Sequence, residues 1–110
     1  MNCILTATPN KVHFAPFLFH GQLSGAFALA SELDYDGVEL HLRTPGDIDR
    51  AVLRELSNRY DLPVSTLGTG MAAREDGLTF TDPDPGIRSQ AVERVKEHID
   101  LATDLHAGVI

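Results

Sequence analysis

The fold is decided by the stretch Leu62-Pro-Val-Ser-Thr-Leu-Gly-Thr-Gly-Met-Ala-Ala-Arg-Glu-Asp-Gly-Leu-Thr-Phe-Thr-Asp-Pro-Asp-Pro-Gly86. Its first part, Pro63 to Leu67, is apolar or β-branched and predicts a short buried strand. Gly68 and Gly70 then allow a sharp turn and a close approach to a ligand, because neither carries a Cβ. The acidic segment 82–86 is typical of a helix start. A loop as long as residues 68–85 is uncommon without a function, so we expect it to form part of a functional surface.

The rest of the chain repeats this alternation of strand and helix. Strands are predicted at Asn2–Thr8, Val38–Leu42 and Pro63–Leu67, and a fourth begins at Ala107–Ile110. A loop is expected at residues 9–20. Helices are predicted at Gln22–Asp34, at Ile48–Tyr60 with Asp47 as N-cap, and at Ile87–Leu105. Each helix carries an apolar stripe: Leu23, Ala26, Phe27, Ala30 and Leu33; then Ile48, Val52, Leu56 and Tyr60; then Ile87, Ala91, Val95, Ile99 and Ala102.

The order β-α-β-α-β-α-β predicts an α/β fold with parallel strands, because each helix returns the chain to the same edge of the sheet. Such units build either an open doubly wound sheet or a closed TIM (β/α)8 barrel. A barrel needs about 250 residues. The 110 residues would then be its amino-terminal half, with three βα units and the start of strand four in one partial domain, 1–110. A chain that stops inside a buried strand favours this partial barrel.

The composition is that of a globular chain that is acidic overall. Hydrophobic residues make up 43% and charged residues 23%, and the net charge of −7 argues against binding to nucleic acid or an anionic membrane. The single cysteine, Cys3, excludes an internal disulfide and fits the cytoplasm. We see no signal peptide and no run of about 20 apolar residues. We therefore expect a cytoplasmic protein.

Several short motifs stand together in the chain: Phe19-His-Gly-Gln-Leu23, Asp36-Gly-Val-Glu-Leu40, Leu67-Gly-Thr-Gly70, Asp76-Gly-Leu78, Thr81-Asp-Pro-Asp84, Ala91-Val-Glu-Arg-Val95 and His98-Ile-Asp-Leu-Ala102. In combination they resemble the sugar phosphate isomerase/epimerase family, part of the xylose isomerase-like TIM barrel superfamily. The Gly-Thr-Gly loop looks most like the keto-sugar epimerase branch that includes 5-keto-L-gluconate epimerase. The resemblance extends over essentially all of the chain.

The resemblance implies a keto-sugar isomerase or epimerase that works by metal-assisted proton transfer through an enediolate. In the family a divalent metal ion (Mn, Mg or Co) and two catalytic carboxylates belong to later strands of the barrel, which this chain lacks. The resemblance therefore assigns no catalytic and no metal-ligating residue here, and it implies that the 110-residue chain alone is inactive. The implied ligand is a small keto-sugar.

Candidate substrate-binding residues follow the predicted strands, because the carboxyl ends of the strands form the active face of such barrels. Arg43 has a fork of donors that suits a sugar hydroxyl or carboxylate; the alternative is a surface arginine on a turn. Thr69 offers a hydroxyl and backbone N–H groups, or it only serves a glycine-rich turn. The full set of candidates is Thr8, His41, Arg43, Gly68, Thr69 and Gly70.

Two further patterns are weaker. The five histidines (His13, His20, His41, His98 and His106) match no zinc spacing. Residues 68–73 formally match the dinucleotide fingerprint Gly-x-Gly-x-x-Gly/Ala. That motif needs a helix immediately after it, and the next predicted helix begins near residue 86, so we reject it. Glu39 lies on a buried strand and needs a partner, in a structural or a supporting role.

Two rival interpretations remain open at this level. The chain is either a complete, small, open α/β binding or interaction module, or a non-catalytic part that associates with a second half. A half-barrel leaves the outer edges of its first and fourth strands unpaired and one face of its sheet without helices. We therefore expect self-association through exposed sheet edges.

Overall fold

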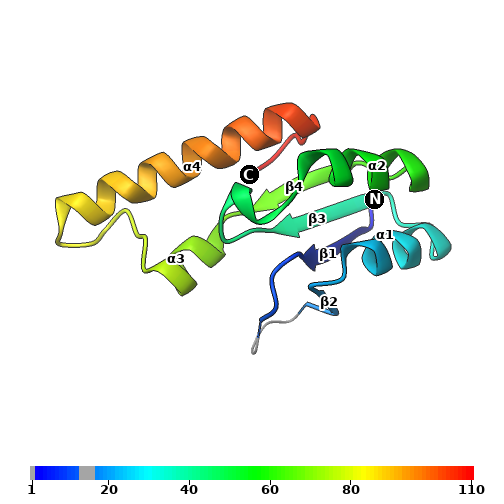
Figure 1. Ribbon diagram of the computed structural model, residues 1–110, viewed down its shortest axis with the longest axis horizontal. Coiled ribbons are helices and arrows are strands. Elements are labelled where there is room, and N and C mark those ends of the chain that lie inside the picture. The colour runs from blue at the N-terminus through cyan, green and yellow to red at the C-terminus, as the bar shows by residue number, and fades with distance from the viewer. Residues whose placement is uncertain (1, 13–16) are drawn as a thin grey trace.

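A computed structural model of the protein describes residues 2–12 and 17–110. Three parallel strands form the centre: β1 (Ile4–Thr8), β3 (Gly37–His41) and β4 (Val64–Gly68). A two-residue strand, β2 (Phe19–His20), completes a four-stranded sheet in the order β2-β1-β3-β4. The three longer strands point the same way, toward the helix α3 (Gly70–Asp76) (Figure 1). The α/β fold with parallel strands is confirmed.

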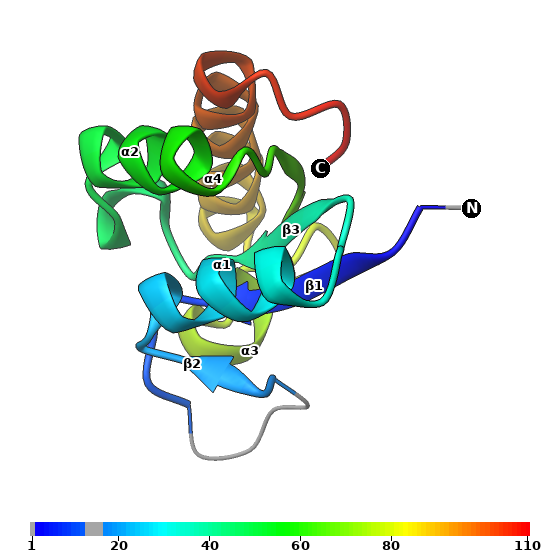
Figure 2. The ribbon, with the colours of Figure 1, turned by 90° about the vertical axis from the view of Figure 1, so that its right-hand side faces the viewer.

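Three helices pack against one face of the sheet: α1 (Leu23–Glu32), α2 (Arg50–Tyr60) and α4 (Pro85–Leu105). The described residues before β1 and the C-terminal residues lie on the side away from α2 (Figure 2). The core joins alternate strand residues to one stripe from each helix: Leu5, Ala7, Val38, Leu40, Leu42, Val64 and Leu67 with Ala26, Phe27, Ala30, Leu53, Leu56, Leu101 and Ala102. Alternation along a strand sends its other side chains to the opposite face. No described helix is long and apolar enough to cross a membrane.

The face of the sheet without helices is largely polar. A β-bulge between Val38 and Glu39 in the pairing of β3 with β4 brings Glu39 opposite Thr66 and His41 opposite Gly68. Thr6 pairs with Glu39 from the other side. We call this surface the open face; its side chains are those of Ile4, Thr6, Thr8, Glu39, His41 and Thr66.

The outer edges of the first and last strands differ in how far they are paired. β2, which lies inside a predicted loop, pairs with β1 at Ala7 and Thr8. The expectation that the outer edge of the first strand is unpaired is therefore wrong at its carboxyl end. On the other side, Val109 forms a parallel bridge with Thr66 and starts the expected fourth strand. His13 and the middle of the predicted loop lie outside the described residues.

The stretch that follows β4 is not only a loop. Residues 70–76 form α3, which ends at Gly77 in the left-handed conformation (φ 68°). A helix therefore does follow Gly68, contrary to the prediction, although its seven residues offer only a short N-terminal end. Asp84 caps α4 through its side chain, which accepts a hydrogen bond from the backbone of Gly86 at 2.7 Å, so the predicted acidic helix start is confirmed.

The second helix begins later than predicted. Asp47 is not its N-cap: it belongs to a 3₁₀ turn, Pro45–Asp47, that Thr44 caps. Asp49 caps α2 instead and accepts a hydrogen bond from Ala51 at 2.7 Å. Val52, assigned to the apolar stripe, is 48% exposed, whereas Leu53 is completely buried. Leu33 and Ile99, also assigned to apolar stripes, are likewise exposed.

The buried side of α4 also includes His98. Its side chain is fully buried, and its Nδ1 donates a hydrogen bond to the carbonyl of Arg94 at 2.8 Å. Its Nε2 has no partner among the described residues. His98 therefore serves packing in this helix, although the sequence places it with polar residues.

Candidate functional site

The carboxyl ends of β1, β3 and β4 bring three predicted residues to one edge of the open face. Ala7 pairs with Leu40 and His41 pairs with Gly68, so Thr8, His41 and Gly68 follow one another across the sheet. Parallel strands end at the same edge, and in barrels of this class that edge carries the active site. We call this group, with Glu39 and Phe17, the carboxyl-end cluster.

The imidazole of His41 is held on three sides within this cluster. A Cβ on Gly68 would lie 2.6 Å from ring atoms of His41, so only glycine leaves room for the ring. The ring of Phe17 lies 4.8 Å away, centroid to centroid, at a tilt of 47°. Nε2 of His41 pairs with a carboxylate oxygen of Glu39, two residues earlier on the same strand. The partner that Glu39 requires is therefore His41.

Thr8 is fully buried at the end of β1. Its hydroxyl accepts a hydrogen bond from the backbone N–H of Asn10 at 3.2 Å and contacts Sδ of Met71 at 3.7 Å. Met71 belongs to α3, so this helix closes over the carboxyl end of β1. Access to the Thr8 hydroxyl in this structure is therefore controlled by α3.

Thr69 and Gly70 begin α3. Thr69 is its N-cap, without a side-chain capping bond, and its carbonyl accepts from the N–H of Ala72 at 3.1 Å. A Cβ on Gly70 would meet nothing within 4 Å. The packing of the chain therefore does not explain the glycine at position 70, in contrast to Gly68.

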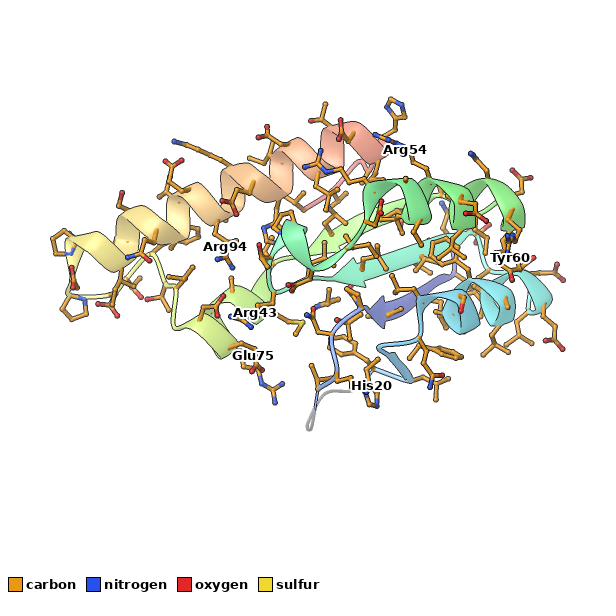
Figure 3. All side chains as sticks on the ribbon, viewed as in Figure 1. His20, Arg43, Arg54, Tyr60, Glu75 and Arg94 are labelled. Atoms are coloured by element: carbon orange, nitrogen blue, oxygen red, sulfur yellow. The ribbon has the colours of Figure 1, made fainter. Side chains whose placement is uncertain are left out.

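Arg43 belongs to an ionic network next to the same edge of the sheet, with Asp76 and Arg94. Its Nε donates to Asp76 at 2.8 Å, and Nη1 of Arg94 donates to the other oxygen of Asp76 at 3.0 Å. The same Nη1 donates to the carbonyl of Arg43 at 2.7 Å. Arg94 points from α4 toward Arg43 (Figure 3). Together these contacts tie the end of α3 to β3 and α4.

The network changes the ionisation of Asp76. Burial by itself raises the pKa of this carboxyl, but hydrogen bonds from Arg94 and Arg43 and the charges of both guanidinium groups outweigh that effect. The pKa of Asp76 therefore lies below its ordinary value. Arg43 itself keeps about half of its side chain exposed (52%).

The described residues do not fit a divalent metal site. Across residues 2–12 and 17–110, no three side chains of His, Cys, Asp or Glu lie close enough to share a metal ion. Glu39 and His41 offer two donors, and they bind each other. A metal ion of the expected kind requires more ligands than this pair provides.

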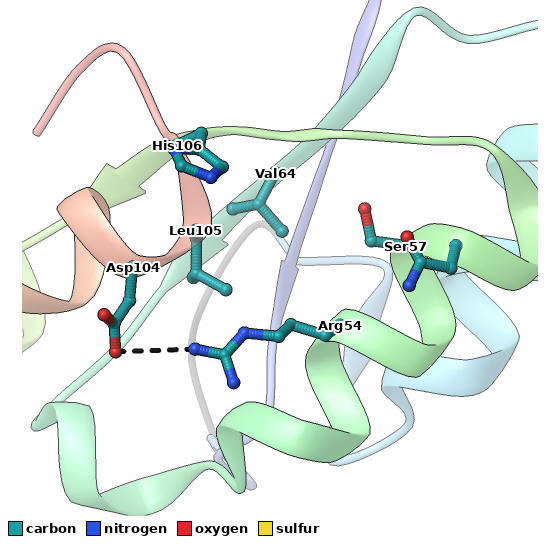
Figure 4. Close-up of a pocket in the computed structure, with 7 residues that line it drawn as sticks. Arg54, Ser57, Val64, Asp104, Leu105 and His106 are labelled. Atoms are coloured by element: carbon teal, nitrogen blue, oxygen red, sulfur yellow. Dashed lines mark ion pairs between the residues drawn. The ribbon is translucent and has the colours of Figure 1, made fainter.

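Two of the cavities among the described residues lie beside the sheet, outside the open face. One of about 230 Å³ lies between α2 and α4 near Val64, at the amino end of β4. There Arg54 pairs with Asp104 at 3.7 Å (Figure 4). The other, of about 320 Å³, lies between α3 and α4 and is mainly apolar. The first is at the end of the strands opposite to the carboxyl-end cluster, so it does not extend that cluster.

Sequence analysis missed Phe17, Met71, Asp76 and Arg94 as members of this region. Phe17 and Met71 read as ordinary apolar residues of a loop. Asp76 and Arg94 come from different elements, 18 residues apart, and only the folding of α3 against α4 joins them. No local sequence signal marks such pairs.

Comparisons with known proteins agree with this architecture. The fold is similar to the crystal structure of N-terminal His-tagged D-allulose 3-epimerase from Methylomonas sp. in complex with D-allulose, with a TM-score of 0.68 and 22% sequence identity. The match covers 97% of this chain and 35% of that chain, so the chain spans about a third of the length of that protein. No curated protein matches the chain. A family model described as a xylose isomerase-like TIM barrel matches residues 27–110, and the chain therefore belongs to the xylose isomerase-like TIM barrel family.

Proposed function

We propose that residues 1–110 form one wall of the active site of a keto-sugar isomerase or epimerase. The observation that carries this proposal is the carboxyl-end cluster. Its His41 lies on the open face of a parallel sheet, at the edge where barrels of this class bind their substrates. The similarity to an epimerase structure that contains D-allulose supports a keto-sugar as the ligand.

In this proposal the 110 residues are the first three βα units and the start of strand four of a complete barrel. The reaction moves a proton on the carbon beside a carbonyl, through an enediolate. A divalent ion (Mn²⁺, Mg²⁺ or Co²⁺) would polarise that carbonyl. Because the described residues do not fit such an ion, it and the proton-transferring carboxylates would belong to other parts of the barrel. The role of this chain is to bind and orient the sugar.

The substrate contacts divide between the open face and its rim. We assign His41 to the open face and Arg43 to the rim, where the side chain of Arg43 is half exposed and its guanidinium suits a hydroxyl or carboxylate. Thr69 and Gly70 would offer backbone groups at the start of α3. Thr8 and Gly68 complete the predicted set, with Gly68 acting through the room that it leaves for His41. We also propose a cytoplasmic location, which suits a chain whose single cysteine, Cys3, is free.

The test uses the protein as isolated from its own source, with its intact mass measured first. Keto-sugars are incubated with it and each of the three metal ions, and epimers and isomers are separated by chromatography. We expect interconversion at one carbon beside the carbonyl. His41→Phe should lower kcat/KM about tenfold, the effect of one lost hydrogen bond. Arg59→Gln, on the exposed face of α2, is the control. A complete barrel that converts no keto-sugar with any of the ions would overturn the proposal.

A further inference from the structure

The pairing of Glu39 with His41 determines which ring nitrogen of His41 carries hydrogen. An ionised carboxylate only accepts hydrogen bonds, so Nε2 of His41 must be the donor in this pair. In the neutral imidazole the other nitrogen, Nδ1, is then an acceptor with a free lone pair. No hydrogen bond to Nδ1 is present among residues 2–12 and 17–110.

The ring is also restrained in position. Gly68 leaves space for the ring directly against the backbone of β4, and Phe17 lies against it from the loop before β2. The side chain of His41 is still 27% exposed and that of Glu39 is 30% exposed. Part of the ring therefore remains accessible, although it has contacts on both sides and Nε2 is paired with Glu39.

We propose that Nδ1 of His41 is a ligand-binding atom that accepts a hydrogen bond from a hydroxyl of a polyhydroxylated ligand. The choice of this ligand class rests on the proposed function. Glu39 is a positioning residue: it holds the tautomer and the ring orientation, as carboxylates do for histidines in other sites. Because the ring is already restrained, it loses little conformational entropy when a hydroxyl binds. This low entropic cost favours the binding of a sugar, which is otherwise held weakly.

The first measurement is the tautomer of His41 by ¹⁵N NMR of the imidazole groups in the full chain. We expect the neutral ring to carry its hydrogen on Nε2, with Nδ1 as an unprotonated acceptor. Glu39→Gln should allow the other tautomer, because an amide both donates and accepts. Glu32→Gln removes the same charge from the exposed end of α1 and should leave His41 unchanged. Protonated Nδ1 in the unmodified chain would overturn the inference.

The second measurement is ligand binding, with D-fructose and with sorbitol, its reduced form, as probes. Addition of a probe should shift the Nδ1 resonance of His41. His41→Phe keeps an aromatic ring against Phe17 but has no acceptor, and it should weaken binding about tenfold. Unchanged affinity in this variant, or no shift of Nδ1 with either probe, would overturn the inference.

The two probes separate this inference from the proposed function. Fructose binding that shifts residues at the carboxyl end of the sheet but not Nδ1 would remove the inference and leave the function standing. A shift of Nδ1 with sorbitol but not with fructose would support the inference and contradict a keto-sugar ligand.

Discussion

Asp76, the last residue of α3, accepts a hydrogen bond from Arg94 of α4, with 3.0 Å between Oδ2 and Nη1. Arg43 donates to the other oxygen of the same carboxylate, so one aspartate holds two arginines that are 51 residues apart in the chain. Because α3 covers the hydroxyl of Thr8 through Met71, this ionic network determines where the rim of the candidate site lies.

Asp76→Asn should destabilise the fold by about 1 kcal/mol at neutral pH, because charge-assisted hydrogen bonds are replaced by weaker neutral ones. The folded-state pKa of Asp76 is lowered, so its contribution is present above the unfolded value of about 3.9 and is lost as the pH falls through the folded value. Urea unfolding at pH 7, 5 and 3 should therefore show a difference from the unmodified chain that shrinks only in acid. Asp104→Asn, in a more exposed ion pair, is the control and should cost less. A difference that is the same at all three pH values would contradict this reading.

Gly68→Ala should displace the ring of His41, because the new Cβ would lie 2.6 Å from it. We expect a loss of about 1–3 kcal/mol in unfolding free energy, as for other overpacked sites. Gly70→Ala, two residues later, meets nothing within 4 Å and should be neutral or slightly stabilising at the start of α3. Thermal unfolding of both variants, with imidazole NMR of His41, tests the pair. Equal stability of the two variants would show that the ring is not confined as described.

Leu53→Ala and Val52→Ala test which side of α2 is buried. The structure buries the side with Leu53, whereas the apolar stripe predicted from the sequence included Val52. Leu53 is fully buried and Val52 is 48% exposed. Removal of the Leu53 side chain should cost about 2–5 kcal/mol, whereas the Val52 change should stay within about 0.5 kcal/mol. Denaturant unfolding of the two variants measures both values. The reverse order would mean that α2 is rotated about its axis.

The chain should self-associate through the outer edge of β4, where Val109 forms an isolated bridge with Thr66 and accepts a hydrogen bond from the N–H of Leu67 at 3.0 Å. Sedimentation velocity over a range of concentrations should show a shift toward larger species. Val109→Lys places a charge at this edge, where Val109 is 58% exposed, and should shift the equilibrium toward monomer. A monomer at every concentration would remove this expectation.

The apolar stripes show how much of the burial of a helix can be predicted from a sequence pattern alone. The predicted stripe of α2 stepped by four residues through Val52, and that of α4 stepped by four residues as far as Ile99. Both of these side chains are exposed. A step of four residues turns a helix by about 400°, so a series of such steps drifts around the axis. The buried positions Leu53 and Leu56, or His98 and Leu101, include steps of three that correct the drift. The sequence predicted the existence of α1, α2 and α4 but not of α3. It predicted their buried sides only in part, since Leu56 and Ala102 are buried as expected but Val52 and Ile99 are exposed.

The sequence by itself determined the alternation of strands and helices, the parallel sheet and the edge at which Thr8, His41 and Gly68 lie, because these depend on local periodicity and on the turns between elements. Only the tertiary structure decided how His41 is held by Glu39, Phe17 and Gly68, and how α3 is tied to β3 and α4 through Asp76. Apart from the pairing of Glu39 with His41 within β3, these contacts join residues from separate elements. Their distances depend on the bulge in the sheet and on helix rotation, which no local pattern encodes.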